Sequence, residues 1–193
     1  MISLLLFAGA AQAQDLPALH AVTDVASNDV LNIRAAPRGS APIIGAFGPH
    51  ETGIEVVALS DNGRWAQVNW EDVSGWSALR FLERLPGQSN PPTTYACFGT
   101  EPFWSLEVDG GNLNRSAIGE DPVPLSQIWQ GSGMRPDRFS LLAAGGGRSL
   151  AASIRREACS DGMSDRAYGL DIDLILDGDG PTSMFSGCCS LAN

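Results

Sequence analysis

Four cysteines are the residues whose chemistry the sequence constrains most, and all lie in the second half of the chain. They are Cys97, Cys159, Cys188 and Cys189. Four cysteines allow three disulfide pairings, and a bridge between the adjacent Cys188 and Cys189 would close a strained ring. We therefore expect Cys188 and Cys189 to reach back, one to Cys97 and one to Cys159. Because neighbouring side chains on a strand point to opposite faces, a single bridge with a free thiol stays open as an alternative.

A zinc site is the rival use of these thiols, and the sequence does not favour it. Zinc sites use closely spaced pairs such as Cys-x-x-Cys, and the second half of the chain contains no histidine. The two histidines, His20 and His50, lie in the first half, so a nucleophile in the second half has no nearby imidazole base. We predict no metal, no cofactor and no His-dependent hydrolase activity.

Carboxylates are the remaining acid–base groups. Glu101, Asp161 and Asp165 lie in two motif segments, and two carboxylates at a suitable separation can hydrolyse a glycosidic bond. The structural interpretation is that Asp161 and Gly162 form a turn, and that Asp165 caps a short helix or pairs with an arginine. We favour this interpretation, and a hydrolase centred on Glu101 and Asp161 is the first alternative.

A second group of acids raises the question of calcium. It consists of Asp171, Asp173, Asp177 and Asp179. An EF-hand loop needs a glutamate at its twelfth position, and counting from Asp173 or Asp177 reaches Met184 or Cys188 instead. We therefore interpret these aspartates as a solvated strand face and a hairpin tip.

The overall charge limits the classes of partner. The net charge is −10, and every basic side chain is an arginine, since the chain contains no lysine. Such an acidic surface repels nucleic acid and anionic lipid headgroups, so neither is an expected partner.

The first residues resemble an export signal. Residues 1–10 form an uncharged apolar run, shorter than the ~20 residues that a spanning helix needs. Ala11-Gln12-Ala13 then supplies the small-x-small pattern of a cleavage site. We predict a signal peptide over residues 1–13 and a mature, periplasmic or secreted chain starting at Gln14. A buried N-terminal helix is the alternative. No cysteine follows the site to carry a lipid, and no stable membrane insertion is expected.

Residues 22–85 have the pattern of a small all-β module. Short alternations of apolar and polar residues are separated by Gly, Pro, Asn and Asp. Strands are expected at residues 30–34, 43–47, 54–59 and 65–70, followed by a segment over residues 74–82. Asp61-Asn62-Gly63 is a strong hairpin signal.

The same segment resembles the bacterial SH3 domain family. The matching motifs, in order, are Leu31-Asn32-Ile33-Arg34, an x-Pro loop, Ile44-Gly45, Asn62-Gly63-Arg64-Trp65-Ala66-Gln67-Val68, and Gly75-Trp76 with Phe81-Leu82. The resemblance implies a small barrel of about five or six strands that holds cell-wall peptide, glycan or a partner protein.

Aromatic and arginine side chains supply the predicted ligand contacts of this module. Trp65 and Trp76 match tryptophans of the SH3 pattern, and we expect them to be buried or half-buried in the core first and at a ligand second. Trp70 lies beside an acidic turn and is the better candidate for an exposed contact, and Arg38 lies in a loop. Guanidinium and indole groups suit muropeptide carboxylates and sugar faces. The predicted contacts are Trp70, Arg38 and Trp76.

The rest of the chain predicts a linker and a second β module. Residues 86–93 are polar and proline-rich, so we expect a linker that does not pack. Residues 94–193 contain about seven or eight short strand patterns and no long helical one. The predicted fold is mostly β: an N-terminal SH3-like small barrel and a C-terminal antiparallel β-barrel or sandwich stapled by disulfides.

The second module carries a resemblance of its own. Its motifs are Cys97, Gly99-Thr100-Glu101-Pro102-Phe103-Trp104, Cys159-Ser160-Asp161-Gly162-Met163-Ser164-Asp165 with Tyr168, and Gly187-Cys188. They resemble an exported bacterial domain family of unknown function, a resemblance that implies no activity. Glu101, Trp104, Asp161 and Asp165 are thus motif residues without an assigned role, and we expect Trp104 and Trp129 in the core.

These observations together predict a non-catalytic exported protein of the cell envelope. Its first module is expected to bind cell-wall material or an envelope protein. Besides the carboxylate-dependent hydrolase, the second alternative is an inhibitor or small-ligand carrier built on the C-terminal module.

Overall fold

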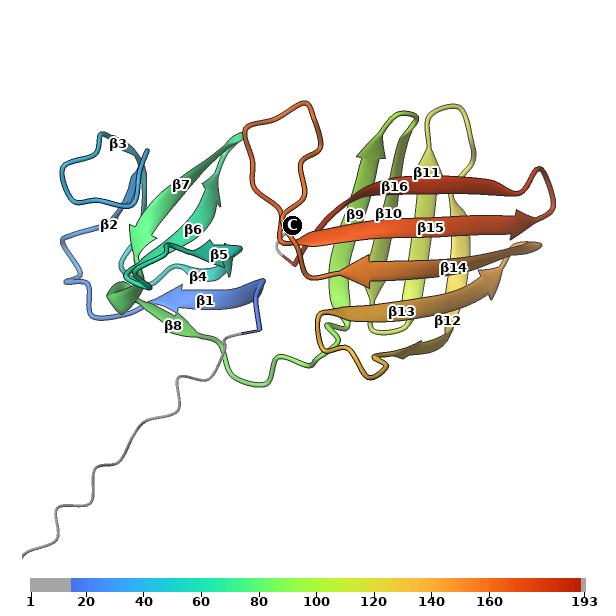
Figure 1. Cartoon of the computed structure of the whole chain (residues 1–193), viewed down its shortest axis with the longest axis horizontal. Helices are drawn as coiled ribbons and strands as arrows, with labels where there is room; N and C mark the ends of the chain where they lie inside the picture. The colour runs from blue at the N-terminus through green and yellow to red at the C-terminus, as the bar shows by residue number, and fades with distance from the viewer. Residues whose placement is uncertain (1–14, 192–193) are drawn as a thin grey trace, which may run out of the picture.

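The chain folds into two all-β units. The computed structural model describes residues 15–191, so the predicted signal peptide and the predicted start at Gln14 lie outside the described residues. Figure 1 shows the two units beside each other. Within residues 15–191, no helix has the length and apolar character needed to cross a membrane.

The first unit consists of two hydrogen-bonded sheets. A three-stranded sheet has the order β4-β1-β8, and a five-stranded sheet has the order β3-β2-β7-β6-β5. The strands are β1 (Ala18–Val22), β2 (Leu31–Arg34), β3 (Ile43–Phe47), β4 (Thr52–Val56), β5 (Ala58–Leu59), β6 (Trp65–Trp70), β7 (Val73–Ala78) and β8 (Leu82–Arg84), with the 3-10 turn η1 (Leu79–Phe81) before β8. The predicted all-β character is confirmed, with eight strands where the resemblance implies about five or six.

Strand β1 lies almost entirely before the predicted start of the module at residue 22. It is the middle strand of the three-stranded sheet, paired with both β4 and β8. Its inward positions are Ala18, His20 and Val22, while Leu19 faces partly outward. Because a histidine and an alanine take inward positions, the apolar pattern of this strand is weak, and the prediction missed it.

The core of the first unit collects side chains from both sheets. Its buried members are Val22, Leu31, Ile33, Phe47, Ile54, Val56, Ala66, Val68 and Leu82. Strand β6 shows the alternation that builds this core, because Ala66 and Val68 are fully buried while Trp65 and Gln67 are not. The opposite face of β6 therefore carries Trp65.

The second unit is a closed antiparallel barrel of eight strands, which decides between the predicted barrel and sandwich. The strands follow each other in chain order and β16 closes onto β9. They are β9 (Thr94–Thr100), β10 (Phe103–Asp109), β11 (Asn112–Ala117), β12 (Val123–Gly131), β13 (Arg138–Gly145), β14 (Arg148–Arg155), β15 (Leu170–Gly178) and β16 (Ser183–Ser190).

Side chains fill the interior of the barrel. Strand β15 points Leu170, Ile172, Leu174 and Leu176 inward, each at most 1% exposed, as its alternation predicts. An eight-stranded barrel is just wide enough for side chains to fill it. This packed interior does not favour the alternative of a ligand carried inside the barrel.

Both predicted disulfides are present, and no cysteine is free among the described residues. Cys97 pairs with Cys189 and Cys159 pairs with Cys188. Cys97 and Cys189 are opposite each other on β9 and β16, and both belong to the barrel core. Cys188 points to the other side of β16, where Cys159 lies in the segment after β14. The opposite faces of neighbouring residues thus permit two bridges from one strand.

Residues 86–93 pack against the first unit, so the prediction that this linker does not pack is wrong. The side-chain oxygen of Gln88 accepts a hydrogen bond from the Leu19 backbone nitrogen at 2.7 Å, and its nitrogen donates to the Leu19 carbonyl at 2.9 Å. Pro92 is buried. One glutamine amide here pairs with both backbone groups of a strand residue, which a composition-based prediction does not capture.

The segment over residues 156–169, between β14 and β15, extends from the barrel to the first unit and contacts it (Figure 1). The backbone of Asp165 forms a parallel bridge with Val73, with Asp165 donating to Asp72 at 3.1 Å and Ser74 donating to Asp165 at 2.8 Å. The Asn69 side chain binds both the nitrogen and the carbonyl of Ala167, each at 2.9 Å. The first unit is therefore held against the barrel by hydrogen bonds to the backbone of this segment.

Candidate functional site

The outer face of the five-stranded sheet carries aromatic and cationic side chains. Trp65 is opposite Ala78, and Gln67 is opposite Trp76, in the β6–β7 pair. Arg34 on β2 is opposite Trp76 from the other side. Because Ala66 and Val68 point inward, Trp65, Trp76 and Arg34 share the outward face, where each is partly exposed.

An open groove of about 1070 Å³ lies along one end of this face. Its cationic and aromatic lining comprises Arg34, Arg64, Trp65, Arg80 and Phe81, and Asp24 and Asp29 supply the acids. The Arg80 guanidinium lies 4.5 Å from the centre of the Phe81 ring, and Arg34 donates to the Ala41 carbonyl at 2.8 Å. Guanidinium groups held in this way offer fixed donors to carboxylates, and an indole offers a flat apolar face to sugars.

Of the three predicted ligand contacts, Arg38 and Trp76 lie at or near the groove, and Trp70 does not. Arg38 is exposed, in the loop whose Gly39 lines the groove, and Trp76 lies on the outer face next to the groove. Trp70 is turned toward the core instead, with its ring 5.8 Å from Phe47 in an edge-to-face contact. A Cβ at Gly45 would come within 2.6 Å of the Trp70 ring, so this glycine makes room for the indole.

The predicted exposure of Trp70 is therefore wrong, whereas the half-buried Trp65 agrees with its predicted core or half-core position. Trp70 shares the parity of the buried Ala66 and Val68, whereas Trp65 has the opposite parity and lines the groove. The alternation along β6 therefore indicates that Trp70 points inward. The prediction of an exposed Trp70 relied instead on the acidic turn beside it.

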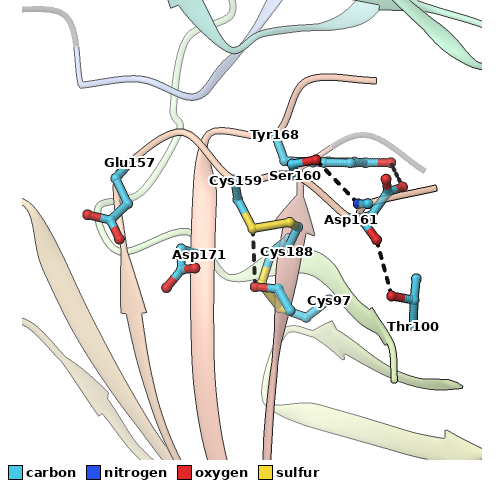
Figure 2. Close-up of a disulfide and its surroundings, with 12 residues drawn as sticks. Cys97, Thr100, Glu157, Cys159, Ser160, Asp161, Tyr168, Asp171 and Cys188 are labelled. Atoms are coloured by element: carbon cyan, nitrogen blue, oxygen red, sulfur yellow. Dashed lines mark hydrogen bonds between the residues drawn. A yellow bond between two sulfur atoms is a disulfide. The ribbon is translucent and has the colours of Figure 1, made fainter. Parts of the chain in front are cut away.

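The two motif segments of the barrel meet around Asp161 (Figure 2). The Thr100 hydroxyl donates to the Asp161 carbonyl at 3.1 Å. The Asp161 carboxylate accepts hydrogen bonds from the backbone nitrogens of Met163 and Ser164, from the Ser164 hydroxyl and from the Tyr168 hydroxyl, at 2.7 to 3.3 Å. The predicted turn at Asp161 is confirmed: this carboxylate organises the segment that reaches the first unit.

The protonation of Asp161 does not suit an acid catalyst. Burial raises its pKa, but the hydrogen bonds from Ser164, Met163 and Tyr168 outweigh burial and hold the pKa below the ordinary value. A general acid in glycoside hydrolysis needs a raised pKa. Glu101 is exposed, immediately before Pro102 in the turn between β9 and β10. The hydrolase alternative gains no support from this arrangement.

The other motif residues, Asp165 and Trp104, take part in contacts that hold the fold together. Asp165 uses its backbone to bridge to Val73, and no helix forms for it to cap within the described segment. Trp104 is 4% exposed inside the barrel, as predicted, and its ring lies against Gly99 and Gly187, where a Cβ would collide with it. The glycines of both motifs thus accommodate this indole.

Trp129 does not lie in the core, so its predicted position is wrong. It is 48% exposed on the outside of the barrel, opposite Leu142. The β12–β13 register shifts between Gln127 and Trp129, which interrupts the alternation of inward and outward residues along β12. A bulge of this kind is not visible in the sequence pattern.

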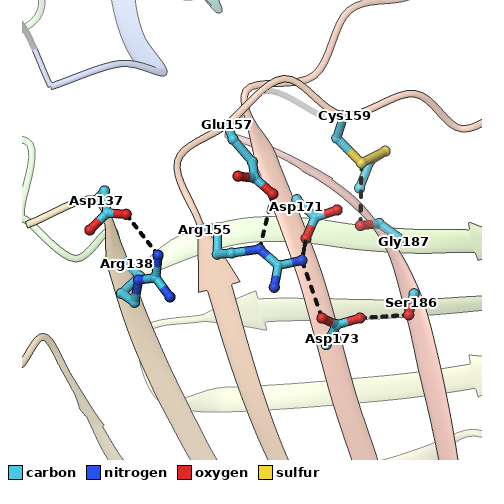
Figure 3. Close-up of polar contacts among 10 residues, drawn as sticks. Asp137, Arg138, Arg155, Glu157, Cys159, Asp171, Asp173, Ser186 and Gly187 are labelled. Atoms are coloured by element: carbon cyan, nitrogen blue, oxygen red, sulfur yellow. Dashed lines mark hydrogen bonds and ion pairs between the residues drawn. A yellow bond between two sulfur atoms is a disulfide. The ribbon is translucent and has the colours of Figure 1, made fainter. Parts of the chain in front are cut away.

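Two of the acids on β15, Asp171 and Asp173, lie beside an arginine (Figure 3), whereas Asp177 accepts a hydrogen bond from Thr182 near the hairpin tip. Arg155 forms ion pairs with Glu157 at 3.0 Å, with Asp171, and with Asp173 at 3.2 Å. The Ser186 hydroxyl donates to Asp173 at 2.6 Å. The cation beside these carboxylates is therefore a side chain of the protein, and no metal-binding group of three or more His, Cys, Asp or Glu side chains occurs in residues 15–191.

The two histidines have contrasting environments. His20 is 1% exposed in β1, with its Nδ1 2.9 Å from the Ala18 carbonyl, and burial lowers its pKa. His50 is exposed in the turn before β4. Sequence reasoning gave neither a role, and the buried position of His20 makes it a structural residue.

Comparison of the chain with protein-family models, with curated proteins and with solved structures finds no match. The resemblance of the first unit to bacterial SH3 domains, and that of the second unit to an exported domain family, therefore stay predictions.

Proposed function

We propose that this is a non-catalytic, exported protein of the cell envelope whose first unit binds cell-wall peptide or glycan. The observation that carries the proposal is the open groove lined by Trp65 and by the guanidinium groups of Arg34, Arg64 and Arg80. An open groove admits a stretch of a long polymer, whereas an enclosed pocket admits only a small molecule.

The charge of the groove supports this choice of ligand. The whole chain has a net charge of −10, yet three of its arginines line this one groove. Guanidinium groups pair with the carboxylates of a wall peptide, and the Trp65 indole can stack on a sugar or an apolar side chain. Asp24 and Asp29 lie in the same lining and can receive the amino groups of such a peptide.

The second unit supports the proposed location. Disulfides form and persist in oxidising compartments, and both pairs of cysteines in the barrel are bonded. The SH3-like resemblance of the first unit points to the same compartment. In this proposal the barrel is a rigid body against which the binding unit is held.

A binding assay on purified peptidoglycan tests the proposal. The full chain is expected to sediment with it, and Trp65→Ala and Arg64→Ala are each expected to lose about five- to thirtyfold in affinity while the melting temperature changes little. Trp129→Ala is the matched control, since Trp129 is an exposed tryptophan on the barrel.

Two results would contradict the proposal. One is sedimentation of both groove variants at the wild-type level, which would place the contact elsewhere. The other is clearing of peptidoglycan in a zymogram by the wild type but not by Glu101→Gln or Asp161→Asn, which would establish the hydrolase instead.

A further inference from the structure

We propose that the junction between the two units contains a second binding site, which takes a small oxyanion between Arg84 and Arg156. The site is a pocket of about 170 Å³, separate from the groove of the first unit. Its lining comes from the start of the described chain, from β8, from residues 87–94 and from the segment after β14.

Two arginines from different units meet in this pocket. Arg84 is the last residue of β8 and donates from Nη1 to the Asp15 carbonyl at 3.1 Å. Arg156 follows β14 and donates from Nη1 to the next carbonyl, that of Leu16, at 3.2 Å. Because the two guanidinium groups bind consecutive carbonyls and line one pocket, their charges lie close together.

These two charges are poorly compensated. Within residues 15–191, neither Arg84 nor Arg156 takes part in an ion pair within 4.0 Å, although the chain as a whole is acidic. The Arg156 Nε is buried and has no hydrogen-bond partner in the same part of the chain. Burial lowers the pKa of Arg156, the nearby Asp15 carboxylate raises it, and Arg84 lowers it further. A buried donor and two like charges are the features that an anion relieves.

Polar side chains line part of the pocket beside the arginines, and Pro17, Leu19, Pro92 and Leu191 supply an apolar wall. Ser89, Asn90 and Thr93 line the pocket, and Asn90 holds Arg156 through a hydrogen bond from Nη2 to Oδ1 at 2.8 Å. The Asn90 nitrogen donates to the Asp15 carboxylate at 3.1 Å, so an acid of the protein already lies at the rim. We interpret Asp15 as a partial, exposed counter-ion that competes with an added anion.

The size of the pocket sets the class of ligand. Pockets for drug-sized molecules have volumes of about 300–1,000 Å³, so 170 Å³ admits a carboxylate, phosphate or sulfate group and little more. The carboxyl end of a peptide and a phosphoryl group present the same chemistry to two guanidinium groups. Acetate and inorganic phosphate are therefore the two probes.

The test is a titration of the full chain by isothermal calorimetry and by thermal melting, with acetate, phosphate or chloride at equal ionic strength. Saturable binding of acetate or phosphate, with a rise in melting temperature that chloride does not give, is the expected result. Binding of acetate alone would assign the site to carboxylates, and tighter binding of phosphate would assign it to phosphoryl groups.

Variants with opposite effects link binding to this pocket. Arg84→Gln is expected to lower the affinity about tenfold, because it removes one charge while its exposed position leaves the fold intact. Asp15→Asn is expected to raise the affinity, because it removes the competing carboxylate. Arg135→Gln is the control, an exposed arginine on the loop before β13. Equal effects of the three anions on the wild type, or unchanged affinity in Arg84→Gln, would overturn the proposal.

Discussion

The two units contain equal numbers of strands but differ in how their sheets end. The barrel closes β9 onto β16, so its hydrogen bonding has no free edge, and two disulfides cross-link it. The first unit keeps two separate sheets, contains no cysteine, and exposes the groove beside Trp65. The difference fits a division of work, in which the closed unit supplies stability and the open unit carries the proposed binding surface.

The junction shows how the two properties are connected. Cys159 lies in the segment over residues 156–169 and is bonded to Cys188 on β16, so the barrel anchors the segment that contacts β6 and β7. Glu55 of the first unit adds a contact, since its carboxylate accepts hydrogen bonds from Ser190 and Leu191. The open unit is thus held by a segment whose own position depends on a disulfide.

Removal of the disulfides should have the largest effect, and it should fall on the barrel. In the chain-entropy account, the Cys97–Cys189 bridge closes a separation of 92 residues and contributes about 4–5 kcal/mol to the free energy of unfolding. The Cys159–Cys188 bridge closes 29 residues and contributes about 3–4 kcal/mol. Denaturant unfolding of the double variants Cys97→Ala/Cys189→Ala and Cys159→Ala/Cys188→Ala measures the contribution of each bridge to the free energy of unfolding.

The two variants should also differ in where they act. Loss of Cys159–Cys188 frees the segment that holds the first unit, so peptidoglycan binding and barrel stability should both change. Loss of Cys97–Cys189, inside the barrel, should leave the contacts of Asn69 in place. Equal melting temperatures of oxidised and reduced wild type would contradict the assignment of stability to the cross-linked unit.

Two tryptophans at the ends of β6 sharpen the comparison within the first unit. Trp70→Ala should lower the free energy of unfolding by about 2–4 kcal/mol, because the indole packs on Phe47 and over Gly45. Trp65→Ala should cost less than about 1 kcal/mol and reduce ligand binding instead, because Trp65 faces the groove. Thermal melts with parallel binding assays separate the two effects. If Trp65→Ala destabilised the fold and Trp70→Ala reduced binding instead, the assignment of Trp70 to the core and Trp65 to the groove would be wrong.

The sequence predicted most strands because local patterns determine them. The aspartates of residues 171–179 predicted the solvated face of β15, and Asp61-Asn62-Gly63 predicted the hairpin between β5 and β6, where Gly63 adopts a positive φ of 65°. The pairing of Cys188 and Cys189 with two earlier cysteines followed from elimination and is confirmed.

Features made by distant residues escaped the sequence. The pocket between Arg84 and Arg156 needs residues 15, 84 and 156 to meet, and no local pattern records that meeting. The packed linker depends on one amide, that of Gln88, aligned with Leu19. Trp70 is a different case, because the alternation along β6 already places it on the same face as the buried Ala66 and Val68.

A smaller effect is expected at the junction. Asn69→Ala removes two hydrogen bonds to the backbone of Ala167 and leaves those backbone groups partly buried without this partner. The expected cost is about 1–2 kcal/mol, and the two units should then unfold at more widely separated temperatures. Asn114→Ala, at an exposed position on β11, is the control. Calorimetric traces of Asn69→Ala and Asn114→Ala that superimpose would show that this contact does not couple the units.

The smallest expected effect is a pH dependence that belongs to the first unit alone, because both histidines lie there. Burial lowers the pKa of His20, the hydrogen bond to Ala18 opposes this, and Arg84 lowers the pKa further. The folded chain therefore keeps His20 neutral at a pH where the unfolded chain, with a histidine pKa of about 6.5, binds a proton. Stability from this residue is complete above about pH 6.5 and is lost as the pH falls through the folded pKa.

Between pH 7 and pH 5 the free energy of unfolding should thus decrease, with a slope of at most about 1.4 kcal/mol per pH unit from His20. His20→Asn keeps a nitrogen donor for the Ala18 carbonyl but does not titrate in this range, so its slope should be shallower. His50→Asn, at the exposed histidine, should keep the wild-type slope. Carboxylates with lowered pKa values, such as Asp161, titrate below this window and do not contribute. Denaturant melts at pH 5, 6 and 7 decide the matter, because identical slopes for wild type and His20→Asn would mean that burial in the open unit is too shallow to hold this imidazole neutral.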